Sequence, residues 1–65
     1  MFRLNCIGYL ANKIYTGQTL TEMRKHFEKA RAYRYQETSF GKTRERKLQT
    51  WELYKEKELI KSGEF

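Results

Sequence analysis

A lone cysteine is the feature that most limits how this chain can be stabilised. A chain of 65 residues forms one small domain and buries only about 60% of the surface that its unfolded form exposes, so its core is marginal. Cys6 has no second cysteine to pair with, and Cys6 and His26 supply two ligands where a structural zinc site needs four. Residues 1–65 must therefore fold as one domain that is stabilised by packing alone or by self-association.

The N-terminal segment, residues 2–18, is predicted to form a β-hairpin. Apolar and polar residues alternate over positions 2–6, which is typical of a half-buried strand. Residues 14–16 form a second β-prone run, and the segment between the two runs is expected to turn with Asn12 at a positive φ angle. A short helix is the alternative, because the apolar residues of this segment also recur at helical spacing.

A capped helix is predicted to follow the hairpin. Thr19 and Glu22 have the spacing of a capping box, and apolar residues then recur every three or four positions to make one stripe. The helix is therefore expected over residues 20–35. A loop is expected over residues 36–42, with Ser39 and Gly41 as its turn residues.

A second helix is predicted over residues 43–61, ended by Ser62 and Gly63. Its apolar residues fall on two separate strips, and the second strip, Leu53 and Ile60, is a candidate protein interface that would also explain a homodimer. The expected fold class is α+β, with an N-terminal β-hairpin followed by two antiparallel α-helices. An all-α three-helix bundle is the alternative.

The charge of the chain points to a polyanionic partner. Fourteen basic residues stand against eight acidic ones, which gives a formal net charge of +6. The excess lies in two blocks: residues 23–34 carry five cations and one glutamate, and residues 42–50 carry four cations and one glutamate. Cations at the start of the second predicted helix oppose the helix dipole, and such local conflicts are enriched at functional sites.

An antiparallel pair of helices would gather most of these cations at one end of the molecule. Arginine binds phosphate and tyrosine stacks on bases, so the mixture suits nucleic acid. We therefore expect a small nucleic-acid-binding accessory or regulatory protein; the alternative is a protein-binding adaptor or inhibitor that docks on an acidic face of a larger protein. The candidate binding residues are Arg24, Lys25, Arg31, Tyr33, Arg34, Tyr35, Lys42, Arg44, Arg46 and Lys47.

No catalytic site, metal site or cofactor is expected. The chain has no aspartate, and its one histidine, His26, is explained by a pairing with Glu22 four residues earlier. Gly41-Lys42-Thr43 lacks the first glycine of a phosphate-binding loop, since Gln36 stands in its place. A free cysteine and the absence of a long apolar run lead us to expect a cytoplasmic protein that does not contact membranes.

Overall fold

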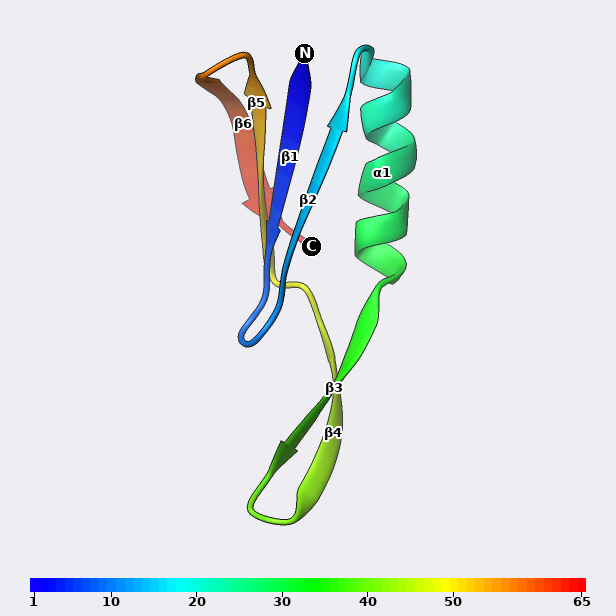
Figure 1. Ribbon diagram of the computed structural model, residues 1–65, viewed down its shortest axis with the longest axis vertical. Coiled ribbons are helices and arrows are strands. Elements are labelled where there is room, and N and C mark those ends of the chain that lie inside the picture. The colour runs from blue at the N-terminus through cyan, green and yellow to red at the C-terminus, as the bar shows by residue number, and fades with distance from the viewer.

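One helix and six strands form two parts, a body and a projecting arm (Figure 1). The computed structural model describes all 65 residues, and its extents are 42 × 19 × 15 Å. The elements are β1 (Phe2–Ile7), β2 (Asn12–Gly17), α1 (Leu20–Ala32), β3 (Arg34–Ser39), β4 (Lys42–Lys47), β5 (Thr50–Lys55) and β6 (Glu58–Glu64). The body is a four-stranded sheet in the order β2-β1-β5-β6 with α1 beside it, and the arm is the β3–β4 pair.

The N-terminal hairpin is confirmed. Strands β1 and β2 pair antiparallel from Phe2 opposite Gly17 to Ile7 opposite Asn12. The predicted position of the turn is wrong, because the chain reverses before Asn12, where the Gly8 N–H donates to the Ala11 carbonyl at 2.7 Å. Asn12 is thus the first residue of β2. The strands decide the matter against a short helix and against the all-α bundle.

The start of α1 is confirmed at its predicted capping box. The Thr19 hydroxyl accepts from the Glu22 N–H at 3.2 Å, and the Glu22 carboxylate accepts from the Gln18 N–H at 3.0 Å. The helix ends at Ala32 and not at residue 35, because Tyr33 has extended backbone angles. From Arg34 onward the chain pairs with β4 instead, so the predicted loop over residues 36–42 is wrong. Of its two predicted turn residues, Gly41 does lie in the turn between β3 and β4, whereas Ser39 is the last residue of β3.

The second predicted helix does not exist, since residues 43–61 contribute to β4, β5 and β6. The two apolar strips are not kept apart in the strands: Trp51 and Leu53, from different strips, point to one face of β5, while Glu52 points to the other. Gly63, read as a helix stop, lies opposite Trp51 in the sheet. A Cβ atom on Gly63 would lie 2.9 Å from the Trp51 ring, so the glycine makes room for the indole.

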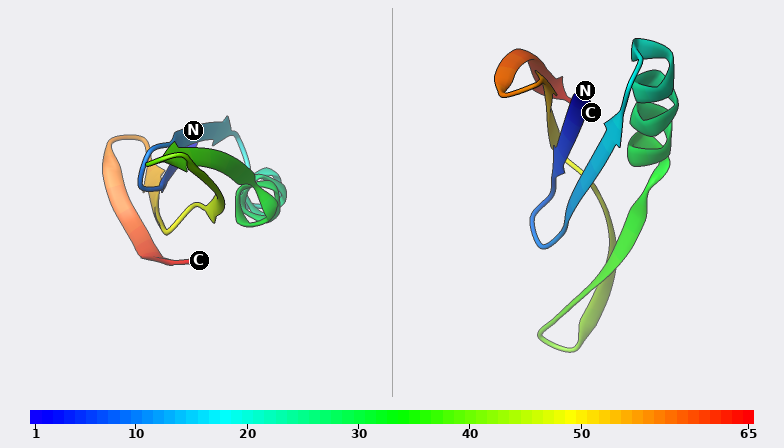
Figure 2. Two further views of the ribbon diagram at one scale, coloured as in Figure 1. Left: turned by 90° about the horizontal axis from the view of Figure 1, so that it is seen from below. Right: turned by 45° about the horizontal axis from the view of Figure 1, so that its top comes forward.

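The hydrophobic core lies between α1 and the sheet. Helix α1 packs mainly against β1 and β2, and its Phe27 ring also contacts Trp51 of β5. Most of the same face of β5 and β6 has no covering helix, and Figure 2 shows α1 lying beside β2. The buried apolar residues are Leu4, Cys6, Met23, Ala30 and Leu48. Burial raises the pKa of the Cys6 thiol to about 11, so this thiol stays protonated at neutral pH.

Candidate nucleic-acid interface

The arm is a two-stranded ribbon with two distinct faces. In an antiparallel pair, directly opposed residues share a face, so the register assigns the side chains. One face, which we call the outer face, carries Arg34, Gln36, Thr38, Thr43, Glu45 and Lys47. The opposite face, which we call the inner face, carries Tyr35, Glu37, Ser39, Lys42, Arg44 and Arg46. Three of the five arm cations therefore lie in one row on the inner side of β4.

The inner face borders a polar hollow of about 370 Å³. Its lining residues are Tyr9, Glu37, Ser39, Phe40, Lys42, Arg44 and Arg46. Alternate residues of a strand are about 6.7 Å apart, so the three cations of β4 present a regular series of positive charges. Such a row suits a polymer with repeating negative charges.

Arg46, the innermost cation of this row, is held within the protein. It forms an ion pair with Glu37, and its guanidinium lies over the Tyr9 ring, 4.9 Å from the ring centroid. Glu37 is only 8% exposed and is the one buried charged residue. Arg46 therefore fixes the base of the arm, while Lys42 and Arg44 form no ion pair in the structure.

The arm is joined firmly to the turn between β1 and β2. The Leu10 N–H donates to the Tyr35 hydroxyl at 3.3 Å, and Leu48, the first residue after β4, is buried. A Cβ atom on Gly8 would lie 3.0 Å from the Tyr35 hydroxyl and 3.2 Å from Leu48. This close packing sets the direction in which the ribbon leaves the body.

A phenylalanine stands at the tip of the arm. Phe40 and Gly41 are the two residues between β3 and β4, with φ angles of 53° and 76°. Two central residues with positive φ are the mark of a type I′ hairpin turn, where Asn-Gly is preferred. A bulky residue held in this region costs on the order of 1–3 kcal/mol. The Phe40 side chain is nevertheless fully exposed and gains no packing in return.

Two of the other predicted cations are engaged at the end of α1. The Arg34 guanidinium donates to the carbonyls of Arg31 and Tyr33, both at 2.8 Å, and so caps the helix. Arg31 lies 3.8 Å from the Glu28 carboxylate. Lys47, opposite Arg34 in the ribbon, has no ion-pair partner.

The two predicted tyrosines lie together at the base of the arm. The Tyr33 and Tyr35 rings stack with centroids 6.2 Å apart, and the Lys13 ammonium lies over Tyr33 at 4.6 Å. Both side chains are half-buried. Tyr33 and Tyr35 therefore support the base of the ribbon, and their rings are not free to stack on bases.

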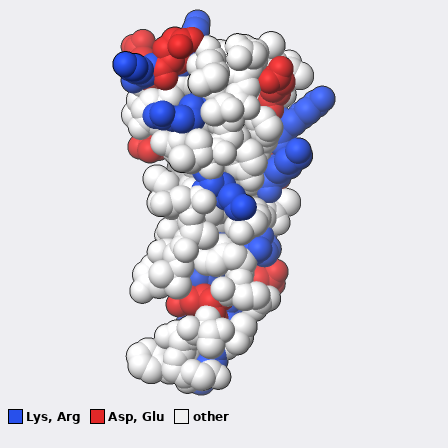
Figure 3. Space-filling view, in the orientation of Figure 1, with Lys and Arg blue, Asp and Glu red and all other residues white.

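The structure gathers only part of the predicted site. Five of the cations lie on the arm, but Arg34 and Arg46 are on opposite faces of the ribbon. Arg24 and Lys25 lie in the first half of α1, at the far end from the arm (Figure 1). Figure 3 shows basic side chains along the edge of the molecule that carries α1, separated by neutral and acidic groups. The positive surface is thus extended along the molecule.

The candidate interface also includes residues that the sequence did not single out. Phe40 supplies the tip, Glu37 holds Arg46, and Tyr9 underlies it. The local signal for the tip is Gly41, a glycine that tolerates the positive φ angle of the turn. The contacts of Tyr9 and Glu37 join distant segments and have no local signature.

The remaining predicted residues lie in the body. Leu53 and Ile60 line an apolar groove beside α1, together with Arg24. His26 stacks on Tyr15 with ring centroids 5.1 Å apart, and the Glu22 carboxylate is bonded to the Gln18 N–H instead of the imidazole. No three His, Cys, Asp or Glu side chains come together in a way that could hold a metal ion.

Comparison with known protein families, curated proteins and solved structures gives no match. The one helix, α1, has neither the length nor the apolar character that crossing a bilayer requires.

Proposed function

We propose that this protein binds nucleic acid through the β3–β4 arm. The observation that carries the proposal is the tip of the arm, where a fully exposed Phe40 is held at positive φ on a ribbon with free cations on both faces. A two-stranded ribbon with no core of its own is marginally stable. A costly apolar tip on such an element is best explained by contact with a partner.

The free cations of the arm would contact phosphates. Lys42 and Arg44 on the inner face and Lys47 on the outer face have no ion-pair partner. A two-stranded ribbon is narrow enough to enter a groove of duplex DNA, and cations on both of its faces would then meet the two phosphate backbones. These contacts fix the position of the ribbon without reading sequence.

Phe40 would act as a wedge against the bases. Proteins that bind the minor groove frequently insert an apolar side chain between base steps, which partly unstacks them and kinks the duplex. The type I′ turn holds Phe40 ahead of the cations, so the ring reaches the bases when Lys42 and Arg44 reach the phosphates. Binding of this kind favours DNA that bends easily.

A salt titration tests the phosphate contacts. With a fluorescein-labelled duplex, three contacts give a slope of log K against log salt of about −2.7, and Lys42→Gln with Arg44→Gln reduces it by about 1.8. The matched control is Lys25→Gln with Lys29→Gln on α1, which removes the same charge and should leave the slope unchanged. Absence of binding at low salt, or equal losses in both double variants, would refute the proposal.

The same assay separates nucleic acid from an acidic protein face. Polyglutamate carries repeated charge without bases, so it would compete with the duplex through the cations alone. Phe40→Ala should weaken duplex binding and leave polyglutamate binding unchanged. Equal binding of the two polymers, with no effect of Phe40→Ala, would favour an acidic protein partner.

A further inference from the structure

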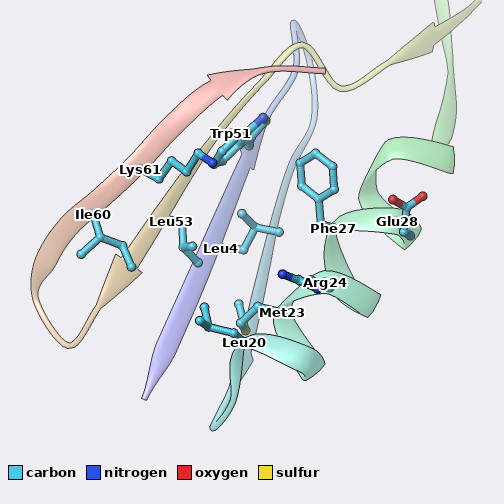
Figure 4. A pocket seen from close by; sticks show the side chains of 10 residues that line it. All are labelled: Leu4, Leu20, Met23, Arg24, Phe27, Glu28, Trp51, Leu53, Ile60 and Lys61. Carbon is cyan, nitrogen blue, oxygen red and sulfur yellow. The ribbon is translucent and has the colours of Figure 1, made fainter.

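An apolar groove runs beside α1 on the face of the sheet that the helix covers only in part. It encloses about 550 Å³ and is lined by Leu4, Leu20, Met23, Arg24, Phe27, Glu28, Trp51, Leu53, Ile60 and Lys61. Figure 4 shows α1 forming one bank and the curled β5–β6 hairpin forming the other. The groove belongs to the body and shares no lining residue with the hollow of the arm.

The part of the sheet that α1 leaves largely uncovered is two strands wide. A helix with its side chains is about 10 Å across, whereas neighbouring strands are about 4.8 Å apart, so one helix covers about two strands. Helix α1 covers β1 and β2. Strands β5 and β6 therefore leave space for a second helix in the same layer, and a complete layer of helices on one sheet face is the usual solution for an α+β domain.

The floor of the groove is apolar, and one of its ends is closed. Phe27 packs edge-on against Trp51 with ring centroids 5.4 Å apart and stacks on Phe65 at 5.2 Å. At the other end Leu20 and Ile60 are 53% and 46% exposed. An occupant would cover these two side chains and would end against the aromatic cluster.

The charges beside the groove select an acidic occupant. Arg24 lies on the helix bank and Lys61 on the strand bank (Figure 4). Glu28, the one acidic lining residue, is already 3.8 Å from the Arg31 guanidinium. A second copy of this chain would bring its own charge of +6 against the same surface, which opposes self-association.

We propose that the groove binds an amphipathic helix of an acidic protein partner, which lies alongside α1 over β5 and β6. Apolar side chains at positions i, i+3 or i+4, and i+7 of the partner would enter the groove, as in other helix-in-groove complexes. Acidic residues on its two flanks would meet Arg24 and Lys61. The occupant would supply the second helix that the sheet of this protein lacks.

Selection from a displayed library of 18-residue amphipathic helices, with the apolar face fixed as leucine and the flanks randomised, tests the proposal with the full chain as bait. We expect enrichment of Asp and Glu on the flanks. The affinity of the best peptide should fall about tenfold or more in Ile60→Glu. The matched control is Ile14→Glu, which places the same charge on a 66% exposed strand residue on the opposite face of the sheet and should change the affinity less than about twofold.

A charge exchange keeps the test decisive if Ile60→Glu disturbs folding. Arg24 is exposed, and Arg24→Glu should weaken binding of the acidic peptide while strengthening binding of a peptide whose facing flank carries lysine. Enrichment of neutral or basic flanks, equal losses in Ile60→Glu and Ile14→Glu, or failure to enrich any peptide would overturn the proposal. A dimer in light scattering that Ile60→Glu dissociates would also overturn it, because the occupant would then be a second copy.

The proposal for the arm and the proposal for the groove can be refuted independently of each other. Lys42→Gln with Arg44→Gln should leave peptide affinity unchanged, and Ile60→Glu should leave duplex affinity unchanged. Loss of duplex binding alone would therefore count against the arm, and loss of peptide binding alone against the groove.

Discussion

The body and the arm of this protein differ in what their side chains do. Four of the five buried apolar residues lie in the body and the fifth, Leu48, lies at the joint, whereas the one buried residue of the arm is the charged Glu37. The body therefore provides the hydrophobic stability, and the arm is held by one ion pair and by its joint. This division leaves the exposed positions of the arm free to carry cations and Phe40.

The largest expected change in the free energy of unfolding comes from a substitution in the body. Leu4→Ala removes a side chain that is 2% exposed at the centre of the sheet and should lower the free energy of unfolding by about 2–5 kcal/mol. Thr43→Ala, in the exposed arm, should change it by less than about 0.5 kcal/mol. Urea denaturation measures both, and equal effects would show that the arm contributes to stability as the body does.

The ion pair at the base of the arm should matter next. Glu37→Ala leaves the half-buried Arg46 without its partner and should cost about 1–3 kcal/mol. The cost should appear as faster hydrogen exchange of the β3 and β4 amides, with protection in β1 and α1 unchanged. Uniform loss of protection over the whole chain would show that the arm and the body unfold as one unit.

A substitution at the tip of the arm should raise stability, in contrast to the two substitutions above. Phe40→Asn places a residue that tolerates positive φ in the type I′ turn and should raise stability by up to about 1 kcal/mol. The same change should weaken duplex binding, because the wedge is lost. Thermal unfolding and fluorescence anisotropy measure the two effects. A variant that is more stable and binds the duplex as tightly as the original protein would show that Phe40 does not contact the duplex.

At neutral pH the smallest effect on stability comes from the thiol in the body. Burial raises the pKa of Cys6 from 9.0 to about 11. Below pH 9 the thiol is protonated in both states, so it should add no pH dependence. Between pH 9 and 11 the unfolded chain loses this proton first, and stability should fall. Comparison with Cys6→Ala isolates the contribution, and identical pH profiles would show that the thiol is not buried.

Local signals predicted the first half of the fold well. Alternation over residues 2–6 and the capping box at Thr19 and Glu22 depend on neighbours in the chain, and both the hairpin and the start of the helix are confirmed. The later segment combines charged residues typical of helices with apolar residues at mixed spacings. Strand β5 forms there because β1 pairs with it, from Phe2 opposite Lys55 to Ile7 opposite Thr50, and no local pattern reveals so distant a partner.

The reason for singling out the cations at positions 42–47 needs revision. The cations at positions 42–47 were judged unfavourable because they would open a helix, yet they lie on a strand, where no helix dipole acts. A strand places Lys42, Arg44 and Arg46 on one face. Only Lys47 lies opposite Arg34, and this pairing comes from β3 and β4 and not from two antiparallel helices.

Replacing the arm tests most directly whether it contacts nucleic acid while the body supplies the fold. Tyr35 and Arg46 are directly paired across the ribbon, so residues 36–45 can be replaced by an Asn-Gly turn. The shortened protein should keep the cooperative unfolding and the amide protection of the body and should lose duplex binding at low salt. Retained duplex binding, or collapse of the body, would contradict this division between the two parts.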